Sequence, residues 1–171
     1  MSYFNRFPTL LYDPAGVVNP KLVTNILKRV RLRVNMKKEL VLLDQYEVQE
    51  GETPEIVSDK HHGSPYYHWV ILMTNGITDP YHDWPKSTRQ LQMYINDKYG
   101  ENVNSIKYYY VFQTSGDTEK RIEVPSTTAG AISVSNYEYE VDLNEEKRSI
   151  DLLRNEYLSA FLEEFDRLIK G

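Results

Sequence analysis

Four histidines have the side chains best suited to metal binding or proton transfer, because imidazole titrates near neutral pH and binds transition metals. They are His61, His62, His68 and His82. With Asp83 they could in principle gather around a metal ion, but they form no His-Glu-x-x-His motif and their spacing is not diagnostic. We therefore expect no metal site and no cofactor, and assign these side chains to the surface or to supporting contacts.

Other catalytic patterns are also missing from the sequence. The chain has no cysteine, which excludes a thiol nucleophile, a disulfide framework and a Cys-ligated metal site. It has no Gly-x-Ser-x-Gly elbow, P-loop or Gly-x-Gly-x-x-Gly motif. Glu52 and Asp83 could form a carboxylate pair for glycoside hydrolysis, but among 25 acidic residues some such pair can always be found. We expect a protein that is not an enzyme and has no small-molecule substrate.

The composition indicates a folded chain of about one domain. It has 171 residues, of which 40% are hydrophobic and 14 are tyrosines, whereas disordered chains have few aromatics. The longest apolar run, Val70 to Met73, is far shorter than the roughly 20 residues that span a bilayer. No signal-peptide pattern opens the sequence. These features predict no membrane partner, and the tyrosines suit either internal packing or protein interfaces.

The charge is divided unevenly along the chain. Residues 1–40 carry eight basic and two acidic side chains, a net charge of +6, whereas the remaining residues carry a net charge of −11. A basic arm on an acidic body indicates an electrostatic contact with the body itself, with an acidic neighbour or with nucleic acid. Charged and apolar residues alternate over 29–34, which predicts a strand with Arg29, Arg31 and Arg33 on one face. This pattern is not that of a glycine-rich or aromatic-interleaved RNA-binding arm, so we do not expect nucleic acid as a partner, and the arginines can equally well pair with carboxylates across a protein interface.

The N-terminal segment is expected to be extended. Residues 1–20 hold three prolines among several aromatic and aliphatic residues, and proline blocks regular helix and central strand. Such an apolar arm needs a groove on its own body or on a neighbour. Residues 21–28 are expected to form a short helix, with their apolar side chains on one side.

The block 46–99 is expected to be mainly helical after one strand. Tyr46 to Val48 predicts a short strand, and Thr53 followed by Pro54 predicts the start of a helix that runs to about residue 60. A second helix is expected from near residue 65 to 75, and a third over 87–99 with Ser87 as its N-cap.

The C-terminal half is expected to hold strands followed by one long helix. Residues 106–113 and 121–124 predict a hairpin, 125–135 a loop, and 136–141 a half-exposed strand whose Glu138 and Glu140 are solvated. Asp142 with Glu145 predicts a capping box that opens the last helix. That helix carries a long apolar stripe, which packs in the core or docks on another subunit; its residues are Ile150, Leu153, Tyr157, Phe161, Phe165 and Leu168.

The run from Tyr46 to Lys60 resembles the start of a LysM module, which opens with Tyr-x-Val-x-x-Gly-Asp/Glu-Thr. The resemblance implies a βααβ fold; its core positions here are Tyr46, Val48, Gly51, Thr53, Trp69 and Asn75. In secreted LysM proteins two loops bind N-acetylglucosamine, and here they correspond to Glu50 to Pro54 and Gly76 to Pro80. One alternative is therefore a peptidoglycan-binding LysM module.

The stretch from Gly63 to Trp84 more specifically resembles the LysM-like baseplate wedge subunit of contractile-tailed bacteriophages. Its signature is roughly Gly-x-Pro-x-Tyr-x-Trp-Val-x-Leu-x-x-Asn followed by Asp-Pro-Tyr-x-x-Trp, and this chain contains both parts. The resemblance implies a structural subunit of the virion, assembled in the host cytoplasm. It implies six copies per baseplate, which clamp neighbouring wedge proteins and the sheath-initiating subunit around the tail tube.

We therefore expect an α+β fold: a small LysM-like βααβ core with an extended N-terminal arm, a β-hairpin region and a long C-terminal amphipathic helix. Its four parts are 1–40 (the arm), 41–99 (the LysM-like domain and the following helix), 100–142 (the hairpin region) and 143–171 (the helix). The residues expected to contact partners are Tyr3, Phe4, Phe7, Leu11, Arg29, Arg31, Arg33, Tyr66, Tyr81, Trp84, Tyr157, Phe161 and Phe165.

Overall fold

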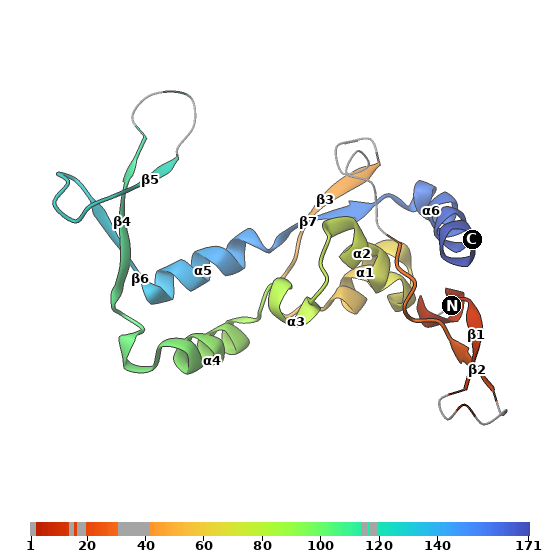
Figure 1. Ribbon diagram of the computed structural model, residues 1–171. Coiled ribbons are helices and arrows are strands. Elements are labelled where there is room, and N and C mark those ends of the chain that lie inside the picture. The colour runs from red at the N-terminus through yellow and green to blue at the C-terminus, as the bar shows by residue number, and fades with distance from the viewer. Residues whose placement is uncertain (1–2, 14–15, 17–19, 31–41, 114–115, 117–119) are drawn as a thin grey trace. The chain divides into compact units, whose positions relative to one another are not determined.

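The computed structural model describes residues 3–13, 16, 20–30, 42–113, 116 and 120–171 (Figure 1). Helices and strands are both present, which confirms the α+β class. Contacts divide the chain into two compact units: the first joins Met1–Trp84 to Ser149–Gly171, and the second is Pro85–Arg148. None of the described helices combines the length and the apolar character that a bilayer crossing requires.

Strand β3 (Leu43–Glu47) and strand β7 (Ser149–Leu153) form the sheet of the first unit. They pair antiparallel, with Tyr46 opposite Ile150, although about 100 residues separate them in the sequence. The helices between them in this unit are α1 (Pro54–His62), η3 (Pro65–Tyr67), α2 (His68–Asn75) and the short α3 (Pro80–Asp83). The first two helices follow the prediction closely, whereas β3 overlaps the strand predicted over 46–48 only at Tyr46 and Glu47. The order is strand–helix–helix–strand once β7 is included.

Local sequence explains where these helices begin. The hydroxyl of Thr53 accepts a hydrogen bond from the Ile56 amide (3.4 Å), and Pro54 occupies the first turn, where it loses no helical hydrogen bond. Gly51, in the turn before the helix, has a φ of 76°, a conformation that a residue with a Cβ rarely adopts. The N-cap at Thr53 is therefore confirmed.

Helix α2 contributes to both apolar clusters of the first unit. It is apolar nearly all round, which is typical of a helix buried on several sides. One cluster consists of Phe7, Trp69, Val70, Leu153, Phe165 and Ile169. The other consists of Val48, Val57, Ile71, Trp84, Ile150 and Leu152. The two clusters together tie the N-terminal segment and the C-terminal helix to the same core.

The N-terminal segment is a short helix followed by a hairpin, so the prediction of an extended arm is wrong. After η1 (Tyr3–Arg6), strand β1 (Thr9–Tyr12) pairs antiparallel with β2 (Lys21–Thr24). The helix predicted over 21–28 is therefore also wrong, because the β-branched residues Val23 and Thr24 pair across the hairpin instead of following a helical face. Of the strand predicted over 29–34, residues 31–34 lie outside the described residues.

The second unit combines two helices with a three-stranded sheet. Helix α4 (Thr88–Tyr99) is followed by η4 (Gly100–Asn102), and β4 (Ile106–Phe112) lies between β5 (Arg121–Val124) and β6 (Ile132–Ser135). The last element is α5 (Asn136–Glu146). The predicted hairpin and the predicted Ser87 cap are confirmed; Ser87 and Gln90 form a full capping box.

Residues 132–146 differ from the prediction. The segment expected to be a loop ends in strand β6, and the strand expected over 136–141 is helix α5. Ser135 caps this helix together with Glu138, so the capping box predicted at Asp142 is wrong. Glu140 is buried rather than solvated, because it accepts hydrogen bonds from Lys98 (2.8 Å) and Tyr99 (2.7 Å) on α4.

The expected single C-terminal helix is interrupted. Residues 149–153 form β7, and helix α6 (Asn155–Lys170) begins only after it. Ile150 and Leu153 therefore belong to a strand, where pairing with β3 overrides their helical spacing. Of the rest of the apolar stripe, Tyr157, Phe161 and Phe165 lie on α6 and pack in the core around Trp69, whereas Leu168 is 49% exposed.

Candidate interaction surface

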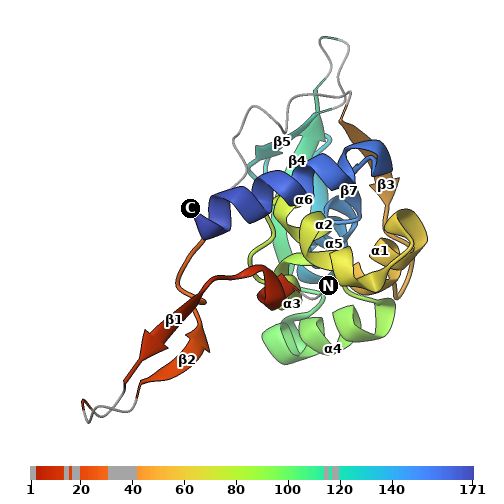
Figure 2. The same ribbon diagram turned by 90° about the vertical axis from the view of Figure 1, so that its right-hand side faces the viewer.

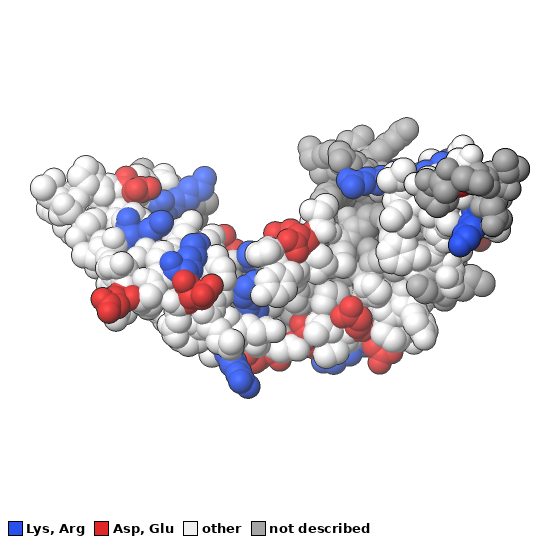
Figure 3. Space-filling view, turned by 60° about the horizontal axis from the view of Figure 1, so that its bottom comes forward, with Lys and Arg blue, Asp and Glu red and all other residues white. Residues whose placement is uncertain are grey.

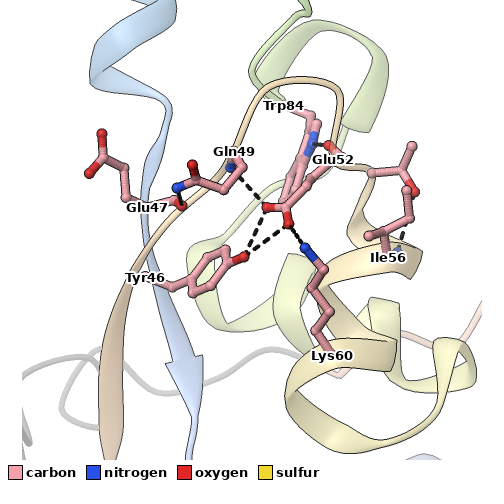
Figure 4. A network of polar contacts seen from close by, with 8 residues as sticks. Tyr46, Glu47, Gln49, Glu52, Ile56, Lys60 and Trp84 are labelled. Carbon is pink, nitrogen blue, oxygen red and sulfur yellow. Dashed lines mark hydrogen bonds and ion pairs between the residues drawn. The ribbon is translucent and has the colours of Figure 1, made fainter.

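A buried carboxylate organises the turn between β3 and α1 (Figure 4). Glu52 accepts hydrogen bonds from the Tyr46 hydroxyl (2.9 Å) and the Gln49 amide (2.8 Å), and it pairs with Lys60 on α1. Burial pushes the pKa of Glu52 upward, but the hydrogen bonds and the Lys60 ammonium outweigh it, so the pKa lies below its ordinary value. This network fixes the turn to the strand before it and to the helix after it.

The same turn anchors α3 of the first unit. The Trp84 indole donates a hydrogen bond to the Glu52 carbonyl oxygen (2.8 Å), and the Trp84 ring is buried in the second apolar cluster. Asp79 caps α3 by accepting from the Tyr81 amide (3.0 Å) and from His82 (2.6 Å). Tyr81, in contrast, is 79% exposed. The motif Asp-Pro-Tyr-x-x-Trp thus presents one exposed aromatic ring on a turn fixed at both ends.

Asn75 joins the end of α2 to strand β7. Its amide nitrogen donates to the carbonyl oxygens of Ile71 (2.9 Å) and Asp151 (2.8 Å), and its side-chain oxygen accepts from the Asp151 amide (2.9 Å). The side chain therefore occupies the hydrogen-bonding position that a further strand would take beside β7. This contact holds the strand–helix–helix–strand arrangement together.

An aromatic cluster fixes the root of the N-terminal hairpin. Tyr3 packs against Phe7 and Trp69, with ring centroids 4.9 and 5.1 Å apart, and Trp69 packs against Phe165 of α6 at 4.6 Å. Arg6 contacts both carboxylate oxygens of Asp166 at 2.9 Å. The segment before the hairpin is therefore held on the core by rings and by a largely buried guanidinium.

The hairpin beyond this root exposes a large apolar surface. Leu11 and Leu22 lie opposite each other in the β1–β2 register, and each is 68% exposed. Ile26 (63%) and Leu27 (85%) follow on the same segment. Figures 1 and 2 show the hairpin projecting away from the helices of its own unit. A two-stranded hairpin is marginally stable in water, so this surface is suited to being covered by another molecule.

Comparison with known protein families identifies the family of this chain. Residues 15–116 match the family described as "Base plate wedge protein 53", which is more than half of the chain. This chain belongs to that family. It is also similar to the "Baseplate wedge protein gp53" of Enterobacteria phage T4, with 27% identity over 147 residues, covering 75% of this chain and 74% of the phage protein.

Membership of the base plate wedge protein 53 family places the protein in the tail baseplate of the phage virion as a structural component, and it interacts there with other baseplate components. Family membership favours this role over the carbohydrate-binding alternative. The resemblance of residues 46–84 to a LysM module stays a prediction. Figure 3 shows basic and acidic side chains interspersed on one face, without a continuous basic strip among the described residues.

The structure separates the residues expected to contact partners into three groups. Those exposed are Phe4, Leu11, Arg29, Tyr66 and Tyr81. Those partly buried against the core are Tyr3, Tyr157 and Phe161, and those fully buried in it are Phe7, Trp84 and Phe165. Phe7, Trp84 and Phe165 thus support the surface from the interior of the unit. The expectation that these three residues form part of the surface is corrected. Arg31 and Arg33 lie outside the described residues.

Sequence reasoning missed Leu22, Ile26 and Leu27, which this wedge-family chain exposes beside Leu11. The expected helix over 21–28 placed their side chains together on one side. The signal that could have revealed them is the pair of short apolar runs on either side of Pro14, Gly16 and Pro20, which is the pattern of a hairpin.

His61 and His62, at the end of α1, make supporting contacts with the segment where β7 ends and α6 begins. His61 contacts the Leu153 carbonyl oxygen through Nε2 (2.9 Å), and His62 Nδ1 lies 2.8 Å from the Asn155 side-chain oxygen. The side-chain amide nitrogen of Asn155 donates a hydrogen bond to the His61 carbonyl oxygen (2.6 Å). The side-chain oxygen of Asn155 therefore accepts from His62. Within the described ranges, no group of three or more potential ligands is placed to hold a metal ion.

His62 gives a pH-dependent contribution to stability. Its Nε2 is buried without a hydrogen-bond partner among the described residues, and burial lowers the pKa of His62. The unfolded chain therefore takes up a proton first as the pH falls, so stability decreases below about pH 6.5, by at most about 1.4 kcal/mol per pH unit. Urea unfolding at about pH 7.5 and about pH 5.5 will show a smaller decrease in H62Q than in the wild type. Equal decreases in both proteins would contradict this assignment.

Proposed function

We propose that this protein clamps neighbouring baseplate wedge proteins, including the sheath-initiating subunit, around the tail tube by protein–protein contacts, with six copies in each baseplate. The family match supports the baseplate role. The finer proposal rests chiefly on one observation, which is the projecting hairpin with four largely exposed aliphatic side chains on a fixed root. The helices and polar networks of the first unit act as the scaffold that presents it.

The physical argument is that the hairpin carries its apolar groups outward at a defined place. Leu11 and Leu22 form one cross-strand pair, so a partner can cover both with a single surface. Covering one large aliphatic side chain contributes about 1.5–3 kcal/mol. Because the aromatic cluster and the Arg6–Asp166 pair already order the root, binding loses less conformational entropy than the docking of a free tail would.

Tyr81 offers a second, smaller contact. It lies on α3. Asp79 caps the start of this helix, and Trp84, the residue directly after its end, is buried. An exposed tyrosine on a fixed turn supplies contact area with little loss of side-chain entropy and keeps a hydroxyl for hydrogen bonding. We infer that it adds to the partner contact of the first unit.

The test is the incorporation of a hairpin variant into the wedge. Co-expression of L11S/L22S with the neighbouring baseplate proteins of the same phage, followed by affinity purification and sedimentation, is expected to show at least about a tenfold loss of bound neighbours. The matched control is M93S, since Met93 is 62% exposed and lies in the second unit. If L11S/L22S bound the neighbouring proteins as well as the wild type does, and M93S were equally unaffected, the hairpin would not be the clamp.

A further inference from the structure

We propose that the hairpin of one copy of this chain docks, head to tail, on the acidic outer face of helix α1 in a second copy. The inference rests on the proposed function only for the expectation that several copies meet in one baseplate. The docking itself is a property of the purified chain. It starts from the charges and the exposed apolar residues of two separate regions of the first unit.

The hairpin side of this contact is both apolar and basic. Lys21 lies on β2 beside Leu22, and Lys28 and Arg29 follow Leu27 directly. No described residue forms an ion pair with any of these three cations. The segment therefore presents positive charge that no described residue pairs with, next to the most exposed leucines of the described chain.

The complementary side is the segment that follows the N-terminal one. Residues 41–84 carry eight acidic side chains and one basic one, a net charge of −7, against +6 for residues 1–40. On α1 the acidic residues Glu55 and Asp59 are four residues apart and therefore share one helical face, where Ile56 is 43% exposed beside them. Two like charges at this spacing repel each other, so a cation placed over them stabilises the helix.

The hairpin is held on its own molecule at both ends. Arg6 is held by Asp166, and Val30 packs against the core cluster on the other side of the hairpin, so both ends of the segment are fixed. With these anchors in place Leu11, Leu22 and Leu27 remain largely exposed. Besides Asp13 in the hairpin itself, opposite charge is available on a second copy, whose α1 face carries Glu55 and Asp59 with the exposed Ile56 between them.

A contact between two different surfaces of identical chains has a geometric consequence. After the first contact forms, one copy still has an unused α1 face and the other an unused hairpin, so the association continues. It closes if the rotation between copies divides a full turn evenly, and a ring of six is one such closure. The contact is electrostatic at its edge, so it weakens as salt is added.

Sedimentation velocity of the purified full chain tests this directly. At about 25 mM salt the average sedimentation coefficient is expected to rise with protein concentration, and at about 500 mM salt it is expected to fall towards that of the monomer. Two charge-reversal variants, K21E/K28E and E55K/D59K, are each expected to weaken association at least tenfold. K120E/K170E makes the same net change in charge as K21E/K28E, at exposed lysines outside both regions, and is expected to associate like the wild type.

An equimolar mixture of the two charge-reversal variants is the decisive measurement. The reversed hairpin of one variant faces the reversed helix of the other, so association is expected to return to within a few fold of the wild type. Circular dichroism checks that each variant is folded. If E55K/D59K does not fold, the neutral variant E55Q/D59N is used to test the α1 face. A wild-type monomer at every concentration in low salt, unchanged association in either variant, or a mixture that stays monomeric would each overturn the self-contact. A monomer whose L11S/L22S form still loses the wedge proteins would leave the proposed clamp standing.

Discussion

Replacing Trp69 with alanine is expected to lower the free energy of unfolding of the first unit by about 3–5 kcal/mol. The ring lies at the centre of the aromatic cluster, 4.6 Å from the Phe165 ring and 5.1 Å from the Tyr3 ring, measured between centroids. Its removal leaves a cavity bounded by three separate elements, which are η1, α2 and α6, so the surroundings cannot collapse around it easily. Urea unfolding followed by circular dichroism measures the change.

W69F provides the matched variant for this prediction. The Trp69 indole nitrogen is buried with no hydrogen-bond partner among the described residues, and such a group costs stability in the folded state. Phenylalanine keeps most of the ring contacts and removes that nitrogen, so W69F is expected to lose less than half of what W69A loses. If W69F were as destabilised as W69A, the aromatic contacts around Tyr3 and Phe165 could not be the main contribution.

Replacing Glu52 with alanine is expected to destabilise the first unit by about 2–4 kcal/mol. The substitution removes the acceptor of the Tyr46 hydroxyl and the Gln49 amide and leaves Lys60 without its partner. Lys60 is itself largely exposed, so most of the loss comes from the hydrogen bonds rather than from the ion pair. E52Q keeps the size of the side chain and is expected to retain part of the stability; a loss below about 0.5 kcal/mol in E52A would contradict the network.

The Glu52 network also has a defined pH dependence. The pKa of Glu52 is lower in the folded chain than its ordinary value, so the carboxylate contributes stability above about pH 4.3, the ordinary value for Glu. This contribution is lost as the pH falls through the lowered folded pKa. The difference in unfolding free energy between the wild type and E52Q is therefore expected to shrink in acid, and urea unfolding at several pH values measures it. A difference that stays constant down to about pH 3 would contradict the assignment.

The starts of several helices could be predicted because their causes are local. Thr53 with Pro54, and Ser87 with Gln90, carry the hydrogen bonds that begin α1 and α4, and each cap lies within three residues of the group it satisfies. The signature from Gly63 to Trp84 could also be recognised as a string of residue types. Its role in the fold was not visible, because the partner of Trp84 is the Glu52 carbonyl oxygen.

Predictions failed where a distant partner decided the structure. Tyr137, Tyr139 and Val141 alternate like a strand, but the capping box at Ser135 and the bonds of Glu140 to α4 favour a helix there. Ile150 and Leu153 continue a helical stripe in the sequence, but β3 is available to pair with them. The spacing of apolar residues alone could not distinguish a helix from a strand in these two segments.

The sequence by itself determined the α+β class, the first helices with their caps, the hairpin of the second unit and the family signature, because each depends on residues close together in the chain. Only the tertiary structure decided that β7 closes the first unit and that Trp84 and Phe165 are interior. It also decided that the hairpin of β1 and β2 exposes Leu11 and Leu22. Whether a residue is buried depends on which segments pack over it, and here those segments lie up to about 160 residues away in the sequence.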